Sequence, residues 1–150
     1  MSGSLFYIFF FGASLALIAA TLFFYFRKRN ARRFLTTMRL SVLDRTVQKG
    51  CRYIEANYAL PGLSISDVCK ELVTGEAYLD ALFMKEIGIG VQDFITQVRV
   101  HSIKHLLAVN PSADITKVYA QSGFTDKDTA EKCFSRVCKI DISGYINSLR

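Results

Sequence analysis

Hydrophobic and polar positions divide the chain into two parts with different patterns. Residues Leu5–Phe26 contain no charged side chain, and about 20 apolar residues are the length that a helix needs to cross the hydrocarbon core of a bilayer. Beyond residue 50, apolar residues instead recur three and four positions apart, which predicts short amphipathic helices. We therefore expect a short extracytoplasmic N-terminus over residues 1–4, a transmembrane helix over 5–26, a basic juxtamembrane stalk over 27–49 and a helical domain over 50–150.

A cluster of basic residues follows the apolar run directly, at Arg27, Lys28, Arg29, Arg32 and Arg33. Basic residues mark the cytoplasmic flank of a span and are attracted to anionic lipid. A secretory signal peptide would carry its charge before a shorter apolar run, and a half-exposed core helix would not be apolar all round. The pattern favours a single-pass protein of the inner (cytoplasmic) membrane that contacts lipid, with its N-terminus outside and its C-terminal domain in the cytoplasm.

Small residues recur every four positions within the apolar run, at Gly12, Ala16 and Ala20. On a helix this spacing creates a flat strip against which a second span can pack closely. The strip predicts a homodimer formed through the span. The alternative is that small residues are simply common in membrane spans.

The second part of the chain is predicted to form seven helices. Apolar spacing predicts a first helix that starts at Cys51 and ends before Leu60-Pro61-Gly62. Capping residues and turn signals place the others over about 64–72, 76–87, 91–109, 114–121, 126–138 and 142–149. Two short helices around a tight turn form a helix-turn-helix unit. The predicted fold class is all-α: one transmembrane helix, then two helix-turn-helix units joined by a long connecting helix.

The net charge of +6 is concentrated beside the apolar run. Residues 27–49 carry eight basic side chains against Asp44 alone, whereas residues 50–150 carry 11 basic and 12 acidic ones, a formal charge of −1. The basic character therefore indicates a membrane surface and not a nucleic acid. The four cysteines lack the paired spacing of zinc or redox sites, and His101 and His105 share a helix face without a third ligand. Because the sequence also lacks catalytic and phosphate-binding motifs, we expect no enzyme activity, no cofactor and no metal.

A set of motifs runs in unbroken order through residues 50–150. Ile54-x-x-Asn57-Tyr58 and Leu63-Ser64-Ile65 precede Tyr78-Leu79-x-x-Leu82-Phe83-x-Lys85-x-x-Gly88, and Arg99 and Gly123-Phe124-Thr125-Asp126 follow. In this order they resemble the AraC/XylS-type DNA-binding domain. The resemblance implies a bacterial transcriptional regulator whose recognition helices, 76–87 and 126–138, enter the major groove of double-stranded DNA. It assigns DNA contacts to Gly75, Glu76, Ala77, Asp80, Ala81, Lys85, Thr125, Lys127, Asp128, Lys132 and Arg136.

Several positions depart from the family pattern. Gly75-Glu76 and Asp80-Ala81 replace its usual Ser-Pro and Ser-Arg, and Thr129-Ala130 replaces an aromatic pair. A carboxylate can accept a hydrogen bond from cytosine N4, but beside phosphates it weakens binding. Fold alone does not decide function, so two hypotheses follow. The first is a membrane-anchored regulator that binds DNA. The second is a membrane-tethered adaptor that kept the fold, lost DNA binding and binds a protein partner through Glu76, Asp80, Asp126, Asp128 and Glu131.

Overall fold

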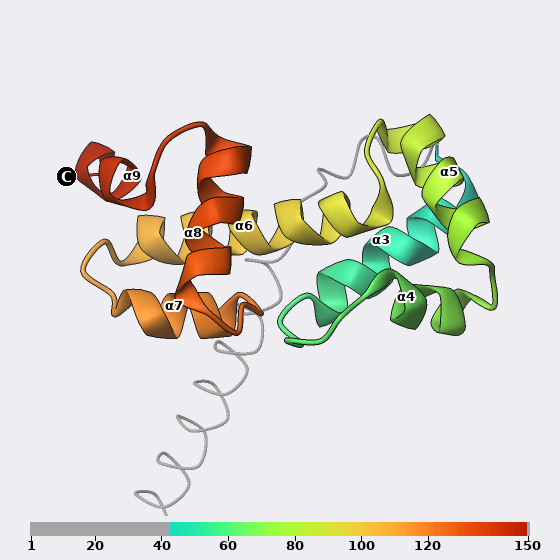
Figure 1. Cartoon of the computed structure of the whole chain (residues 1–150), viewed down its shortest axis with the longest axis horizontal. Helices are drawn as coiled ribbons and strands as arrows, with labels where there is room; N and C mark the ends of the chain where they lie inside the picture. The colour runs from blue at the N-terminus through green and yellow to red at the C-terminus, as the bar shows by residue number, and fades with distance from the viewer. Residues whose placement is uncertain (1–42, 150) are drawn as a thin grey trace, which may run out of the picture. The chain divides into compact units, whose positions relative to one another are not determined.

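The computed structural model describes residues 43–149 of the chain. In this part the protein is all-α, with seven helices labelled as in Figure 1. Their bounds are α3 (Arg45–Asn57), α4 (Ile65–Leu72), α5 (Glu76–Ile87), α6 (Val91–Val109), α7 (Ile115–Gln121), α8 (Lys127–Cys138) and α9 (Ile142–Ser148). The all-α class and the two helix-turn-helix units, α4–α5 and α7–α8, are confirmed.

None of the helices over residues 43–149 is long and apolar enough to cross a membrane. The transmembrane helix predicted over 5–26 lies outside the described residues. So do the self-association strip of Gly12, Ala16 and Ala20 and the basic cluster Arg27, Lys28, Arg29, Arg32 and Arg33.

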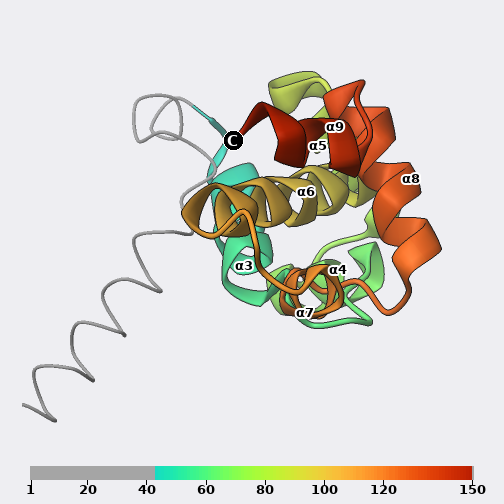
Figure 2. The same cartoon turned by 90° about the vertical axis from the view of Figure 1, so that its left-hand side faces the viewer.

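Helix α6 is shared by the two halves of the described domain. Figure 1 shows it running between an N-terminal half, α3–α5, and a C-terminal half, α7–α9, and Figure 2 shows it in the middle of the domain when viewed from the end. Its first turns place Phe94, Ile95 and Val98 in the core of the N-terminal half, where Phe94 packs edge-on against Phe83 at a centroid distance of 5.6 Å. Its later turns place Ile103 and Leu107 in the core of the C-terminal half. One helix therefore supplies part of both cores.

Helix α3 begins before the predicted boundary at residue 50. The Asp44 side chain caps it by accepting a hydrogen bond of 2.7 Å from the Thr46 amide, and the helix then continues through Gly50. The space left by the missing side chain of Gly50 is occupied by Phe83, whose ring atoms lie 3.0 Å from where a Cβ would stand. Glycine here allows close packing and does not end the helix. The helix expected from Cys51 therefore begins earlier, at Arg45, and includes Gly50.

Short-range hydrogen bonds explain where α4, α7 and α9 begin. The Asp67 carboxylate accepts from the backbone amide (3.0 Å) and the hydroxyl (2.7 Å) of Ser64, which fixes the start of α4. Asp114 caps α7 by accepting from the Thr116 amide at 3.0 Å, and Asp141 caps α9 by accepting from the Gly144 amide at 3.1 Å. A polar side chain that satisfies exposed amides of the first turn stabilises a helix end.

Candidate nucleic-acid interface

The first helix-turn-helix unit presents α5 on the surface. Helix α4 ends at Val73, which adopts a left-handed conformation (φ 52°), and Gly75 then occupies the N-cap position of α5. Leu79 and Phe83 are fully buried and hold the helix on the core. The predicted contact residues that lie on the exposed surface of this unit are Gly75, Glu76, Ala77, Ala81 and Lys85.

The exposed face of α5 is mostly apolar. Tyr78 is 60% exposed, because its position on the helix lies away from Leu79 and Phe83. Met84 is 52% exposed, beside the exposed Ala77 and Ala81. Apart from Glu76 in its first turn, the one charged residue exposed on this helix is Lys85, which forms an ion pair with Glu86 at 3.9 Å. The face offers methyl and aromatic surface rather than cations.

Asp80, which was predicted to contact DNA, forms a hydrogen bond within the domain that the sequence did not predict. It is half-buried, and its Oδ1 accepts a hydrogen bond of 2.8 Å from the backbone amide of Val91, the first residue of α6. The preceding residue, Gly90, has no side chain to occupy this space, where a Cβ would lie 2.6 Å from Asp80 Oδ1. The carboxylate of Asp80 therefore joins α5 to the start of the connecting helix.

The second helix-turn-helix unit presents α8. Asp126 accepts a 2.7 Å hydrogen bond from the Thr129 amide, which starts the helix and holds the pKa of the Asp126 carboxyl below its ordinary value. Ala130 and Phe134 are fully buried beneath it, and the Phe134 ring lies 5.5 Å from that of Tyr145. All the predicted contact residues of this unit are exposed: Thr125, Lys127, Asp128, Lys132 and Arg136.

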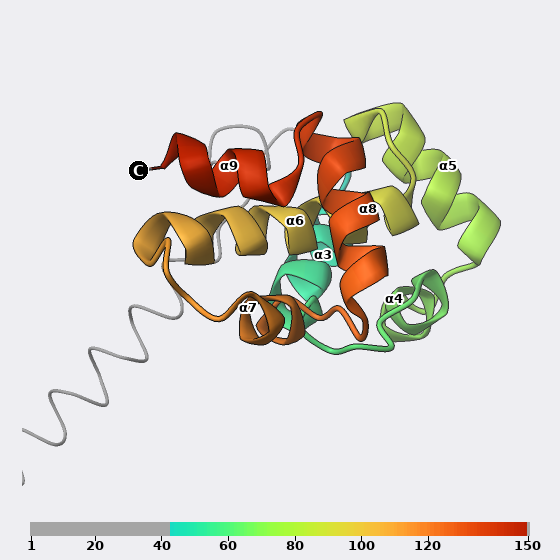
Figure 3. The same cartoon turned by 60° about the vertical axis from the view of Figure 1, so that its left-hand side comes forward.

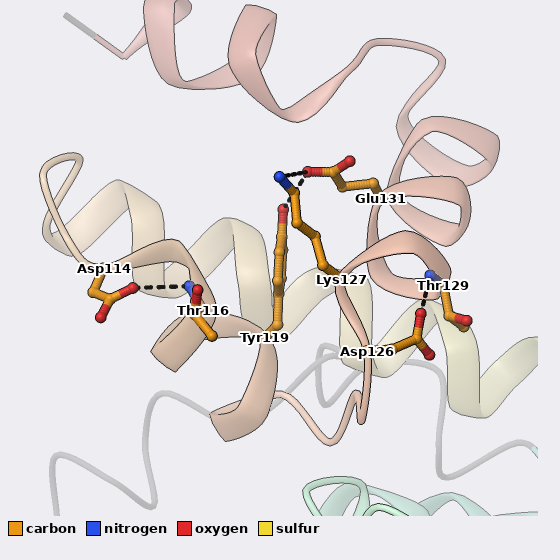
Figure 4. Close-up of polar contacts among 7 residues, drawn as sticks. All are labelled: Asp114, Thr116, Tyr119, Asp126, Lys127, Thr129 and Glu131. Carbon is orange, nitrogen blue, oxygen red and sulfur yellow. Dashed lines mark hydrogen bonds and ion pairs between the residues drawn. The ribbon is translucent and has the colours of Figure 1, made fainter.

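Intramolecular partners differ among the three cations of α8. Lys127 pairs with Glu131 at 3.8 Å, and Glu131 also accepts a hydrogen bond of 3.2 Å from the Tyr119 hydroxyl of α7, as Figure 4 shows. Burial and the neighbouring Glu131 charge raise the pKa of Tyr119, so its hydroxyl remains a donor. Arg136 pairs with Asp93 of α6 at 3.4 Å. Within residues 43–149, Lys132 has no carboxylate within 4 Å.

Arg99 connects the two halves of the domain. From α6, its Nε donates to the Tyr58 carbonyl at 3.0 Å and its Nη2 donates to the Leu60 carbonyl at 2.8 Å. Its guanidinium carbon lies 5.8 Å from the ring centroid of Phe124, which follows the turn between α7 and α8. Arg99 is 9% exposed. It therefore acts as a structural residue rather than as part of a phosphate-binding surface.

The same junction includes a glycine and a chain of hydroxyl groups. Gly123 has a φ of 83°, and a Cβ at this residue would lie 2.2 Å from the Tyr58 carbonyl oxygen. The Ser102 hydroxyl donates to the Tyr58 hydroxyl at 3.2 Å, and the Ser122 hydroxyl donates to Ser102 at the same distance. The loop after α3 and the turn before α8 are thereby held in direct contact.

Comparison with known proteins gives matches to this region. Residues 68–148, more than half of the chain, match the family model described as a helix-turn-helix domain. The lactose operon transcription activator of Staphylococcus xylosus is 24% identical over 73% of this chain. The Msm operon regulatory protein of Streptococcus mutans is 31% identical over 48% of this chain. The chain spans only 38% and 26% of these two relatives.

Solved structures share the fold. The C-terminal domain of AraT, a response regulator from Geobacillus stearothermophilus, superposes with a TM-score of 0.67 at 19% identity, over 71% of this chain and 87% of that one. The C-terminal domain of the response regulator yesN from Fusobacterium nucleatum gives a TM-score of 0.62 at 24% identity, over 69% of this chain and 99% of that one. At these identities the likeness concerns the arrangement of the helices.

Proposed function

Because the chain belongs to the AraC-type family of helix-turn-helix domains, we propose that it is a transcriptional regulator that binds double-stranded DNA from a membrane-anchored position. The observation that carries the proposal is the presence of two exposed helices, α5 and α8, each the second helix of its unit. In helix-turn-helix proteins this second helix enters the major groove. With two such units on one connecting helix, the chain could contact two successive segments of a duplex.

The two helices would contribute differently to binding. Helix α8 carries Lys127, Lys132 and Arg136, and cations at a duplex surface gain affinity by neutralising phosphates. Helix α5 exposes Ala77, Tyr78 and other apolar side chains, which favour contact with the thymine methyl group in the major groove. We therefore assign most of the electrostatic affinity to α8 and a preference for thymine-containing sequence to α5.

Salt-dependent DNA binding tests this proposal. The full-length protein should bind a DNA fragment from upstream of its own gene more tightly than a shuffled duplex, with affinity that falls steeply as salt rises. Lys132→Gln should reduce the slope of log affinity against log salt by about 1, because one phosphate contact is lost. Lys49→Gln is the matched control, since Lys49 is an exposed cation on α3, outside both helix-turn-helix units.

Two results would count against DNA binding. One is an affinity that does not depend on salt, and the other is equal affinity for the promoter fragment and the shuffled duplex. In either case the adaptor hypothesis would take its place. Charge reversal at Glu76 and Asp128, which are exposed on α5 and α8, should then weaken capture of the protein partner.

The membrane anchor is a separate part of the proposal and rests on the sequence. An uncharged run over 5–26 and a basic cluster at 27–33 support a single-pass anchor of the inner membrane with the C-terminal domain in the cytoplasm, in contact with anionic lipid. Replacing both Leu15 and Leu17 by Asp places two charges in the middle of the run, at a cost of about 2.5–3.5 kcal/mol each. The double variant should leave the membrane fraction on cell fractionation, whereas a double replacement by isoleucine should not. Retention of the Asp variant in membranes would refute the anchor.

Pairing of spans is the last part of the proposal. Close packing through Gly12, Ala16 and Ala20 would raise the local concentration of DNA-binding domains. Gly12→Ile should reduce energy transfer between two fluorescently tagged copies in a membrane, because the branched side chain separates the helices. Leu17→Ile, which leaves the small residues in place, is the control. Equal energy transfer in both variants would exclude this strip as the contact.

A further inference from the structure

A pocket of about 490 Å³ lies on the C-terminal half of the domain, at the end of α8. Its lining residues belong to α6, to the last turn of α8 and the segment that follows it, and to α9. Figure 3 shows these three helices next to one another, and the Tyr145 hydroxyl of α9 donates to the Lys104 carbonyl of α6 at 3.4 Å. The volume falls within the range of about 300–1,000 Å³ that is usual for small-molecule sites.

The polar lining of the pocket includes Gln97, His101, Lys104 and Ser148, and Lys104 is the one lysine or arginine among them. Lys104 contributes an ammonium group, and its Nζ lies 5.7 Å from the centroid of the Tyr145 ring. No aspartate or glutamate lines the pocket, and no carboxylate of residues 43–149 lies within 4 Å of Lys104 Nζ. A cation that lacks an acidic partner in a partly enclosed space attracts an anion more strongly than one in open water. The polar lining therefore fits a single carboxylate.

The pocket also has an apolar lining. Val100 of α6 is buried there, and Val137 and Ile140 line the pocket while remaining 37% and 45% exposed. Two of the large hydrophobic side chains that are exposed in the described residues thus lie together at one pocket, facing the same space as Lys104. Covering them would remove apolar surface from water. The combination of polar and apolar lining selects a molecule with one anionic end and an apolar body.

We propose that this pocket binds a small amphipathic monocarboxylate, with its carboxylate at Lys104 and its apolar body against Val100, Val137 and Ile140. Because Val137 belongs to α8, a bound molecule would contact the end of the second recognition helix. The ligand is then an effector that changes the affinity of α8 for DNA. This effector role rests on the proposed function, whereas binding of the carboxylate does not.

Calorimetric titration of the full-length protein with arylalkyl carboxylates tests the site. Affinity should rise from benzoate to 3-phenylpropionate and 4-phenylbutyrate, by roughly fourfold for each methylene that becomes buried. The neutral amide of 4-phenylbutyrate should bind at least tenfold more weakly, because a hydrogen bond to a charged group is lost. These probes are water-soluble, and the amide also controls for non-specific uptake by a lipid or detergent phase.

Two variants locate the binding. Lys104→Gln should weaken 4-phenylbutyrate binding about tenfold or more, while Lys104→Arg should retain it because the positive charge remains. Ile140→Asn should remove the gain in affinity with chain length. Lys117→Gln is the matched control, since Lys117 is an exposed lysine on α7 and does not line the pocket. Circular dichroism of each variant establishes that it is folded.

Three outcomes would overturn the site: acid and amide bind equally, Lys104→Gln binds like the unaltered protein, or no binding occurs at millimolar concentration. If the carboxylate binds and the affinity for promoter DNA is unchanged, the effector role is refuted and the binding site stands. If the protein binds no DNA at all, the proposed function fails, while the calorimetric result is unaffected. The two proposals can therefore be refuted separately.

Discussion

The contact at Gly123 leads to the sharpest stability prediction. Gly123→Ala adds one methyl group at a residue whose φ is 83° and whose Cβ would lie 2.2 Å from the Tyr58 carbonyl oxygen and 3.0 Å from Arg99 Nε. Real Cβ atoms do not approach other atoms that closely, so either the turn before α8 or the loop after α3 has to move. The substitution therefore strains the contact between the two halves of the domain.

Three terms set the size of the effect. A left-handed backbone costs a residue with a Cβ about 1–2 kcal/mol. Replacing glycine reduces the conformational freedom of the unfolded chain, which raises the free energy of unfolding by about 0.4–1 kcal/mol. Displacing packed neighbours adds about 1–3 kcal/mol. The free energy of unfolding should therefore fall by roughly 1–4.5 kcal/mol for Gly123→Ala, with a central value of about 3 kcal/mol.

Two other glycines separate these terms. Gly88 has a φ of 88° with nothing within 4 Å of its would-be Cβ, so Gly88→Ala measures the backbone cost alone, about 1 kcal/mol. Gly62 has neither a left-handed conformation nor a neighbour within 4 Å, so Gly62→Ala should change stability by no more than about 0.5 kcal/mol. Urea unfolding of the full-length protein, followed by circular dichroism, gives all three values. Equal losses for Gly123→Ala and Gly88→Ala would refute the idea that the close approach to Tyr58 carries a cost.

Three further predictions follow from the described contacts. Arg99→Met should lower the free energy of unfolding by about 3–5 kcal/mol, because two hydrogen bonds are lost and the Tyr58 and Leu60 carbonyls lose their partner. Urea unfolding measures this loss. A value under about 1 kcal/mol would show that water replaces the guanidinium freely. The Thr129 amide lowers the pKa of Asp126 from its ordinary value of 3.8. The folded state therefore binds fewer protons than the unfolded state, so this stabilisation is complete above the unfolded value and is lost as pH falls through the folded one. Asp126→Asn, which keeps an acceptor for the cap, should flatten the acid side of the stability profile, and an unchanged profile would assign the dependence to other groups. For the proposed DNA contact, replacing thymine by deoxyuridine in the segment that faces α5 should weaken binding by roughly fourfold for each methyl group contacted. The same replacement in the segment that faces α8 should have a smaller effect. Equal effects in a mobility-shift assay would exclude methyl contacts by α5.

The sequence predicted helix ends well wherever the signals were local. The bounds of α5 and α6 agree with the expected 76–87 and 91–109, and α8 is capped by Asp126, where its expected range of 126–138 began. The cap of α8 depends on residues within one helical turn, Asp126 and Thr129. Local caps and turns can be read directly from the order of residues.

Features that depend on distant partners were missed. The hydrogen bond of Asp80 reaches Val91, eleven positions away, so its sequence neighbours suggested an exposed acid on a recognition helix. The close packing at Gly50 does not show in its sequence neighbours, because the ring that packs on it belongs to Phe83 of another helix. The pocket at Lys104 joins three helices, and no motif connects them. The exposure of Tyr78, by contrast, follows from placing α5 on a helical wheel around Leu79 and Phe83.

The junction around Arg99 has a consequence for the spacing of any DNA site. Two halves that share α6 and are also bonded across it move as one piece, so the offset between α5 and α8 along a duplex is fixed. Each base pair inserted between the two contacted segments rotates one relative to the other by about 34–36°. Two units held at a fixed offset cannot adjust to that rotation, whereas two units joined by a flexible linker could. Arg99 would then help to set the number of base pairs between the two contacted segments without contacting DNA itself.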